Sequence, residues 1–343
     1  MKHAPVRSLL LLASTLAACS HAGGAAAVLQ NADGTIRVIH QADVRWDGNA
    51  AQTEMESVLE RFPQLDVVYA HNDPMAKGAA QACRLKGRTG IRFVGVDALA
   101  NEGREYVANG TLDATFEYPT CGAEAIDLAL LACSGVQLPK QLQLGTRTYT
   151  KANLAAGGAA IPAPGDIALA SLRREHAAIL TTEPKTDQVF RIGMAQCTDT
   201  EPWRAAMRDD MKRAAARYPQ LALDYRAADN DIEKQRGIVR DFILQNFNCI
   251  LVSPKESLAL AAVCKEAMAA GIKVVVIDRA LGSDDYTCFV GGDNTAIGRA
   301  AGDYIKTLLP TGGTIVELEG LMTSSPAQER HNGFAEALGL RKP

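Results

Sequence analysis

Aromatic residues, net charge and long hydrophobic segments are all scarce in this 343-residue sequence. Phe, Trp and Tyr make up only 5% of the chain, so each Trp or Tyr near a turn carries more weight as a candidate contact. The formal net charge is −3, and no basic stretch points to a nucleic-acid partner. No segment beyond the N-terminal region reaches the roughly 20 apolar residues that a transmembrane helix needs. The hydrophobic fraction of 47% is that of a folded globular chain, and the length suits two α/β lobes.

The sequence also lacks the short motifs that mark common catalytic and metal sites. It contains no nucleophile elbow, no HExxH, no Walker loop and no GxGxxG after a predicted strand. The seven cysteines after Cys19 show no zinc-binding spacing, and their odd number leaves one thiol unpaired if the others form disulfides. These absences predict a protein that is not an enzyme and that holds neither a metal nor a cofactor.

The first 19 residues resemble a bacterial lipoprotein signal peptide. Basic residues precede the apolar run 8–16, which is too short to span a bilayer. Leu16-Ala17-Ala18-Cys19 matches a lipobox, which implies lipidation of Cys19 and a periplasmic protein held at a membrane by its lipid alone. The alternative is an ordinary small-residue cleavage site. Residues 20–34 are small and polar and are expected to form a tether.

From residue 35 onward, short apolar runs alternate with segments of helical spacing. Strands are predicted at 36–40, 65–70, 91–96, 114–116, 190–195, 221–225, 249–252, 273–277, 289–290 and 314–319. Helices are predicted at 49–61, 75–86, 102–109, 124–133, 203–218, 232–245, 258–270, 296–308 and 327–338. Such alternation is typical of parallel sheets with right-handed crossovers, which predicts two doubly wound α/β lobes. The pattern fails at 155–188, which is rich in Ala, Gly and Pro, although 167–180 has helical spacing.

Five motifs near the predicted element boundaries resemble those of type I periplasmic sugar-binding proteins. They are Val68-Tyr-Ala-His-Asn-Asp-Pro-Met-Ala-Lys-Gly78, Val94-Gly-Val-Asp97, Val276-Ile-Asp-Arg279, Gly291-Gly-Asp-Asn294, and Glu317-Leu-Glu-Gly320 with Ser325-Pro-Ala-Gln-Glu-Arg-His-Asn-Gly-Phe334. Glu201-Pro-Trp-Arg-Ala-Ala206 is similar to the first ligand loop of galactofuranose-binding proteins. The resemblance implies a monomer with two hinged lobes that close on a small sugar-like ligand, and an ABC permease or a membrane sensor as partner.

The order of the segments departs from that family, in which the part resembling 190–338 comes first. The chain therefore resembles a circular permutant, with a gene fragment cut from tandem copies as the alternative. On this interpretation one lobe combines residues 35–117 and 291–343, and the other combines 118–150 and 188–290. Residues 151–187 are then a linker between the usual termini, and crossovers near Tyr118 and Gly291 form the hinge together with the linker end.

The resemblance implies a set of ligand-binding residues at the carboxyl ends of the strands, where doubly wound sheets bind ligands. Asp278, Arg279, Arg330 and Arg204 are expected to grip hydroxyl groups through charge-assisted hydrogen bonds, and the arginine forks also suit a sugar acid. Asn72 and Asp97 end their strands similarly, whereas Asp73 is expected to cap the next helix. Aromatic faces for the sugar ring are expected from Trp203 and Trp46. Glu117 and Tyr118, at a crossover, complete the set.

Four classes of function were weighed on these residues. A binding protein that serves a transporter fits best. A non-transport sensing module, read by a separate kinase or chemoreceptor, has the same sequence features. A transcription regulator of the related repressor family would need a DNA-binding head where this chain carries a signal peptide. An enzyme would need a general acid beside the carboxylates, and no residue is placed to serve as one.

Overall fold

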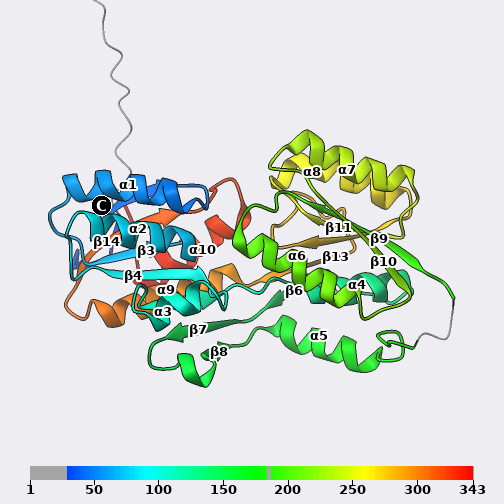
Figure 1. Ribbon diagram of the computed structural model, residues 1–343, viewed down its shortest axis with the longest axis horizontal. Coiled ribbons are helices and arrows are strands. Elements are labelled where there is room, and N and C mark those ends of the chain that lie inside the picture. The colour runs from blue at the N-terminus through cyan, green and yellow to red at the C-terminus, as the bar shows by residue number, and fades with distance from the viewer. Residues whose placement is uncertain (1–28, 184–186, 343) are drawn as a thin grey trace, which may run out of the picture.

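Two separate β-sheets organise the chain into two α/β lobes, which lie end to end in the computed structural model (Figure 1). The structure describes residues 29–183 and 187–342. The predicted signal peptide, with the lipidation site Cys19, lies outside the described residues. Among the helices that are described, none combines the length and the apolar character needed to cross a bilayer.

The first lobe is built on an eight-stranded sheet of order β1-β2-β14-β3-β4-β5-β7-β8. Its strands are β1 (Leu29–Gln30), β2 (Ile36–Asp43), β3 (Val67–Ala70), β4 (Arg92–Asp97), β5 (Ala114–Glu117), β7 (Thr146–Thr150), β8 (Ala159–Ile161) and β14 (Gly313–Glu319). Five neighbouring strands, β2, β14, β3, β4 and β5, run parallel. Strands β1, β7 and β8 pair antiparallel with their neighbours at the edges of the sheet. Its helices are α1 (Gly48–Arg61), α2 (Asp73–Leu85), α3 (Gly103–Ala108), α9 (Asn294–Leu308) and α10 (Ser325–Leu338), and a short 3-10 turn, Leu154–Ala156, follows β7.

The second lobe is built on a six-stranded, wholly parallel sheet of order β10-β9-β11-β12-β13-β6. Its strands are β6 (Gln141–Leu144), β9 (Phe190–Gln196), β10 (Leu221–Ala227), β11 (Cys249–Ser253), β12 (Lys273–Ile277) and β13 (Cys288–Gly292). Its helices are α4 (Gly122–Cys133), α5 (Pro164–Glu175), α6 (Pro202–Ala215), α7 (Ile232–Leu244) and α8 (Ser257–Ala269). The central strands β11 and β12 are runs of Ile, Leu and Val because helices bury them on both faces.

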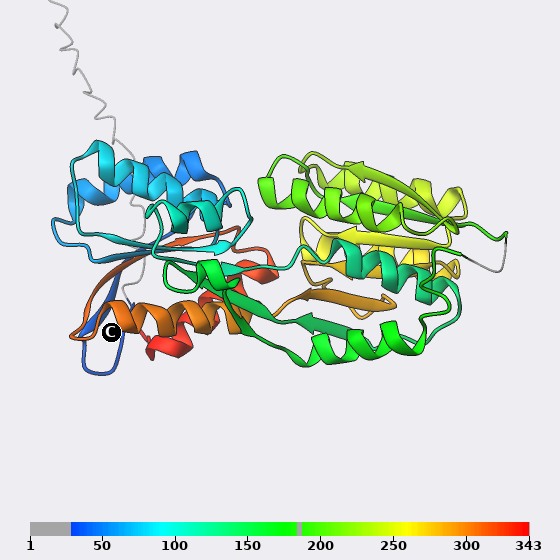
Figure 2. The same ribbon diagram turned by 60° about the horizontal axis from the view of Figure 1, so that its bottom comes forward.

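Helices cover both faces of each sheet, as expected for doubly wound lobes (Figure 2). In the first lobe α1 and α2 pack on one face and α9 and α10 on the other. In the second lobe α4 and α6 oppose α7 and α8. One continuous hydrophobic cluster runs from the α9–α10 face of the first lobe into the α4–α6 face of the second, so the lobes share part of their core.

Four short segments connect the lobes. They are residues 118–121 between β5 and α4, Gly145 between β6 and β7, 162–163 between β8 and α5, and Asp293 between β13 and α9. Hydrogen bonds tie these connections to one another. The Gly145 amide donates to the Asp166 carboxylate at 3.1 Å, and the Asp293 amide donates to the Leu144 carbonyl at 3.0 Å.

The region 151–187 differs from its description as a linker. It contains β8, which pairs with β7, and α5, whose Arg173 donates to Asp127 on α4 at 2.8 Å. Strands β6 and β7 were not predicted, and β7 places residues 146–150 in the lobe opposite to the one expected. Both strands alternate buried and exposed residues near the edge of a sheet, so they lack the apolar runs by which buried strands are recognised.

Candidate ligand-binding site

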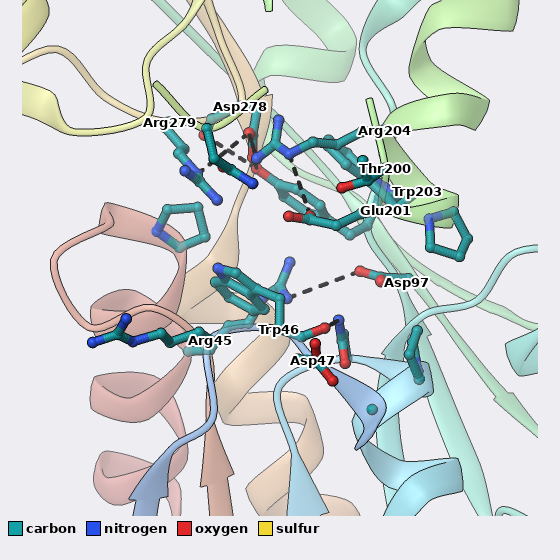
Figure 3. A pocket seen from close by; sticks show the side chains of 18 of the residues that line it. Arg45, Trp46, Asp47, Asp97, Thr200, Glu201, Trp203, Arg204, Asp278 and Arg279 are labelled. Carbon is teal, nitrogen blue, oxygen red and sulfur yellow. Dashed lines mark hydrogen bonds and ion pairs between the residues drawn. The ribbon is translucent and has the colours of Figure 1, made fainter. Parts of the chain in front are cut away.

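A cavity of about 470 Å³ lies between the two lobes, and polar and aromatic side chains from both lobes line it (Figure 3). Nine of the ten side chains predicted to bind ligand line this cavity: Trp46, Asn72, Asp97, Tyr118, Trp203, Arg204, Asp278, Arg279 and Arg330. They come from loops and helix starts that follow the carboxyl ends of strands in both sheets. The structure therefore brings residues that are up to 284 positions apart in the chain, Trp46 and Arg330, into one site.

Asp278 is the buried anion on the six-stranded side. It follows β12 with a left-handed φ of 67°, which turns its carboxylate toward the cavity. The carboxylate accepts hydrogen bonds from Tyr118 Oη at 2.9 Å, Ser253 Oγ at 2.9 Å and Arg204 Nη2 at 3.0 Å. Burial acts to raise the pKa of Asp278, but the charges of Arg204 and Arg279 and the hydrogen bonds from Tyr118 and Ser253 together outweigh burial and lower it. The site therefore holds a fixed negative charge here.

Arg204 supports Asp278, and its nitrogens are already engaged by the protein. Nη1 donates to Gln196 Oε1 at 3.0 Å and to Ser253 Oγ at 3.1 Å, and Nη2 donates to Asp278. Its Nε lies 3.3 Å from Glu201 Oε2 as an ion pair. These contacts hold the guanidinium in place beside Asp278, while Arg204 also lines the cavity and its Nε has no hydrogen-bond partner among the described residues, so a direct contact with the ligand stays a prediction.

Trp203 and Tyr118 form a stacked pair beside Asp278. Their ring centroids are 4.9 Å apart with an interplanar angle of 26°, and Trp203 Nε1 donates to the Tyr118 carbonyl at 2.9 Å. Pro202 begins α6 and sets the helix start that presents Trp203, a position at which proline is favoured. One aromatic wall of the cavity is thus fixed to the connection between the lobes.

Arg330 is the buried cation on the eight-stranded side. Its Nε donates to Asn294 Oδ1 at 2.9 Å, and its Nη1 donates to the His71 carbonyl at 2.5 Å. The guanidinium lies over the Tyr118 ring, 4.5 Å from the centroid. A cation over an aromatic face is an attractive arrangement that is strongest when water is excluded, as it is here.

Asp97 has no hydrogen-bond donor directed at its carboxylate from the residues that the structure describes. It ends β4 with φ at 112°, and its nearest charged partner is Arg330 Nη1, 3.9 Å away. Burial raises the pKa of Asp97 well above its ordinary value, and the Arg330 charge offsets only part of that effect. Asp97 is thus a polar group with unused hydrogen-bonding capacity at the cavity wall.

Trp46 is presented by two successive left-handed residues in the loop between β2 and α1. Arg45 and Trp46 have φ values of 55° and 69°. The indole lies against Gly320, where an added Cβ would stand 2.2 Å from the ring. Its Nε1 is buried and has no hydrogen-bond partner among the described residues, as is also true of Arg279 Nε, which lies 3.8 Å from Asp278 Oδ2 as an ion pair. Both N–H groups therefore remain available to a ligand.

Asn72, and not Asp73, caps the helix that follows β3. Asn72 caps α2, because its Oδ1 accepts from the Met75 amide at 2.9 Å, so the prediction that Asp73 is the cap was wrong. Asp73 is instead buried beneath the loop, where it accepts from Thr115 Oγ1 at 2.7 Å and from the Ala98 amide at 2.8 Å. Asn72 still lines the cavity.

Glu117 is the predicted site residue that does not line the cavity. Its carboxylate lies 3.4 Å from Tyr149 Oη and 3.8 Å from Arg147 Nε, in a second cavity of about 600 Å³ beside the connections. The physical reason is strand alternation. Adjacent residues of an extended chain point to opposite sides, so the Glu117 side chain points away from the ligand cavity, whereas Tyr118 borders both cavities.

Several polar lining residues were missed in the sequence. They are Asp47, Asn49, Thr200 and Asn230, together with Glu201, which stands in the motif 201–206 without an assigned role. Asn230 follows β10, and Thr200 lies in the loop after β9. The rule that ligand contacts follow the carboxyl ends of strands would have indicated both of these residues.

Comparison with known proteins identifies a family. The model of the periplasmic binding protein domain matches residues 15–136 and 192–341. The ribose import binding protein RbsB of Bacillus subtilis is 30% identical over 145 residues, which cover 42% of this chain and 47% of that protein. The galactofuranose-binding protein YtfQ of Escherichia coli is 30% identical over 151 residues, which cover 43% and 47%. The chain thus spans about half the length of these curated relatives.

A solved structure is also similar to part of the chain. The fructose binding periplasmic domain of a hybrid two component system is 41% identical to it, and the match covers 43% of this chain and 49% of that one with a TM-score of 0.42.

Proposed function

Because this chain belongs to the family of periplasmic binding protein domains, we propose that it captures a monosaccharide, or a related polyol or sugar acid, for an ABC sugar transporter. The observation that carries this proposal is the placement of ionisable side chains on both sides of one cavity, with Asp278 and Arg279 on one lobe and Arg330 and Asp97 on the other. The names of the ribose and galactofuranose relatives support a sugar as the ligand class.

The lining chemistry suits a ring of hydroxyl groups. Each hydroxyl both donates and accepts, so it can bond to the Asp278 carboxylate and to an unpartnered N–H such as Trp46 Nε1 or Arg279 Nε. Charge-assisted hydrogen bonds of this kind are stronger than neutral ones. The flat faces of Trp46 and Trp203 suit the C–H faces of a sugar ring.

Ligand capture is proposed to work by closure of the two lobes. A ligand that contacts both lobes has more interactions in the closed form, so it shifts the population toward that form. A membrane partner then reads the closed state. The alternative is a non-transport sensing role, in which a separate sensor kinase or chemoreceptor reads the same closed state. Neighbouring genes for a permease and an ATPase would favour transport.

The proposed location is the periplasm, with the chain held at a bacterial membrane through a lipid on Cys19. Labelling of lipidated proteins in cells tests this anchor. The unaltered protein should carry the label, and a C19A variant should be released without it. The protein is proposed to act as a monomer with no nucleic-acid partner and no cofactor.

The strand orders support a circularly permuted chain. In the six-stranded sheet, β10-β9-β11-β12-β13 is the doubly wound order 2-1-3-4-5 when β9 is counted first. In the eight-stranded sheet, β2-β14-β3-β4-β5 has the same order when β14 is counted first. That count continues from β14 to β2 only if the end of the chain is joined to its start.

The two ends of the described chain meet in space. The Gln30 amide donates to the Arg341 carbonyl at 3.0 Å, and the Arg341 amide donates back to the Gln30 carbonyl at 2.9 Å. Such a junction can be closed and reopened elsewhere without disturbing the core, which is how permuted proteins arise. A remnant of a tandem binding-protein gene remains the alternative. A variant that begins near Val189 and joins 342 to 29 is expected to fold and to bind the same ligand.

A thermal-shift screen of the purified mature protein tests the proposed function. Pentoses, hexoses, furanoses and sugar acids serve as probes, and the specific ligand is expected to raise the melting temperature through binding linkage. D278A and R330A should abolish that shift, whereas D303A, which removes an exposed carboxylate on α9, should retain it. A ligand-induced shift that survives in both D278A and R330A would contradict the assignment of the site.

A further inference from the structure

A layer of titratable side chains lies between the eight-stranded sheet and α10, outside the sugar-like ligand cavity. Glu317 on β14 is fully buried, and Tyr69 is its register partner on β3. His71 follows two residues after Tyr69 and so shares its face of the sheet. A buried layer of this kind is costly unless its groups are paired or hold an ion.

Three titratable side chains of this region, Glu317, Glu319 and His331, converge on one point. His331 Nδ1, on α10, lies 3.1 Å from both carboxylate oxygens of Glu317 and 3.6 Å from Glu319 Oε1. One ligand atom from each of the three residues falls within 4.8 Å of the others. A tetrahedral cation with bonds of about 2.0–2.2 Å holds its ligand atoms about 3.4 Å apart, which is close to the two distances from His331 Nδ1, 3.1 Å and 3.6 Å.

A second set of residues orients the first. Gln41 Nε2 donates to Glu317 Oε2 at 2.8 Å and lies 3.4 Å from Glu319 Oε1. His71 Nδ1 accepts from the Gly320 amide at 3.3 Å, which places its proton on Nε2, and Nε2 donates to Glu317 Oε1 at 3.0 Å. Metal-binding carboxylates are commonly held by outer hydrogen bonds of this type.

Tyr69 supplies an independent sign that the layer is incomplete. It is fully buried, and its hydroxyl has no partner among the described residues. Its ring lies 5.2 Å from that of His71, and it stands opposite Glu317 in the sheet. A buried hydroxyl without a partner costs stability, so it calls for a further hydrogen-bonding group, such as metal-bound water.

The charge balance points to a cation. In the described part of the chain, neither Glu317 nor Glu319 forms an ion pair with a lysine or arginine. Two carboxylates therefore share two imidazoles as their only basic partners. The exposed fractions of the Glu319 and His331 side chains are 13% and 22%, so the cluster opens to solvent on one side.

We propose that Glu317, Glu319 and His331 bind one divalent transition-metal cation of the zinc type, with water at the fourth position. Nitrogen and carboxylate oxygen ligands suit Zn²⁺ in this geometry. The ligands come from β14 and α10, so the cation would fasten the helix that carries Arg330 to the sheet. In the sequence these ligands are Glu-x-Glu and a histidine twelve residues later, a spacing that matches neither HExxH nor the cysteine-based zinc motifs.

The test uses the full mature chain after treatment with a chelator. Zn²⁺ is titrated calorimetrically and by thermal shift, with Mg²⁺ and Ca²⁺ as comparison probes, and Co²⁺ is added to record its visible absorption spectrum. We expect one equivalent of Zn²⁺ to bind, the melting temperature to rise, and Co²⁺ to give the intense spectrum of a four-coordinate site. Mg²⁺ and Ca²⁺ should bind more weakly because they prefer oxygen ligands.

Variants separate this site from adventitious metal binding. E319Q and H331Q keep side-chain size and hydrogen bonding, and each should weaken Zn²⁺ binding at least about 10–100-fold. E336Q, which changes an exposed carboxylate on the same helix, should bind Zn²⁺ like the unaltered protein. Unaltered Zn²⁺ affinity in E319Q and H331Q, or no binding at millimolar Zn²⁺, overturns the proposal.

Folding is checked independently in each variant. Circular dichroism and the sugar-induced thermal shift should be retained in E319Q, since Glu319 does not line the ligand cavity. If a variant fails to fold, the Co²⁺ spectrum and the stoichiometry of the unaltered protein decide the question. A six-coordinate Co²⁺ spectrum or a stoichiometry well below one would then overturn the site.

Discussion

The Tyr118 hydroxyl donates a hydrogen bond of 2.9 Å to the Asp278 carboxylate, and so joins a connection between the lobes to the buried anion of the cavity. The same hydroxyl lies 3.1 Å from the Asp278 carbonyl. Tyr118 also stacks on Trp203 and lies beneath Arg330. One residue of a connection between the lobes therefore contacts the anion, the cation and an aromatic wall of the site.

Removal of this hydroxyl should loosen Asp278 without removing the ring. We expect Y118F to lose about 1.5–3 kcal/mol of unfolding free energy, the usual range for a hydrogen bond to a charged group. The affinity for the sugar-like ligand should fall as well, because Asp278 loses one of its three fixed donors. Urea unfolding and calorimetric titration measure the two effects. Y149F is the matched control, since Tyr149 lies outside the cavity, and an equal loss in both variants would contradict the role of Tyr118.

Gly320 sets the position of Trp46. A Cβ at residue 320 would stand 2.2 Å from the indole, so G320A should displace Trp46 and lower ligand affinity by about ten-fold, corresponding to roughly 1.4 kcal/mol. The measurement is calorimetric titration with the ligand found in the screen. G237A serves as control because nothing lies within 4 Å of its added Cβ. An unchanged affinity in G320A would mean that Trp46 does not contact the ligand.

Asp73 should make stability depend on pH. Burial raises the pKa of Asp73 to about 8, while the unfolded chain ionises this group near pH 4. Between these values the folded protein binds the extra proton, so its contribution is complete below about pH 4 and is lost as pH rises toward 8. The free energy of unfolding should therefore fall by up to about 1.4 kcal/mol per pH unit in this window.

The isosteric variant D73N tests this pH dependence. Its amide can accept from the Ala98 amide and donate to Thr115 Oγ1, so the local hydrogen bonds are preserved. Urea unfolding at pH values from 5 to 8 should give a flatter stability profile for D73N than for the unaltered protein. D303N, at an exposed carboxylate, should leave the profile unchanged. A profile in D73N as steep as that of the unaltered chain would show that Asp73 is ionised in the folded state.

The fold could be predicted from the sequence wherever burial imposes a strong pattern. Strands such as β11 and β12 are covered on both faces, so their apolar runs are evident, and the predicted bounds agree with the structure to within two residues. Strands β6 and β7 have one exposed face, and their alternation is too short to be recognised. The packing of α5 against the second lobe depends on Arg173 and Asp127, a pairing that no local pattern reveals.

The sequence predicted which residues line the candidate site better than it predicted what each of them contacts there. The rule that ligand contacts follow strand ends found Asp278 and Asp97, because both end parallel strands. It could not separate Asn72 from Asp73, since either side chain can cap a helix and only tertiary burial decides between them. It also could not show that Arg204 is held by protein groups, because its partner Ser253 is distant in the chain.

The segment between β8 and α5 has a mechanical consequence. It is a fourth covalent link between the lobes, beside 118–121, Gly145 and Asp293, and hydrogen bonds from Gly145 to Asp166 fasten it to its neighbours. Four connections that lie side by side, and that hydrogen bonds join to one another, resist twisting of one lobe against the other about the long axis. They still permit the lobes to bend apart. The lobes are therefore expected to separate by bending along one direction, with torsion suppressed, so that Asp278 and Arg330 face each other again each time the molecule closes.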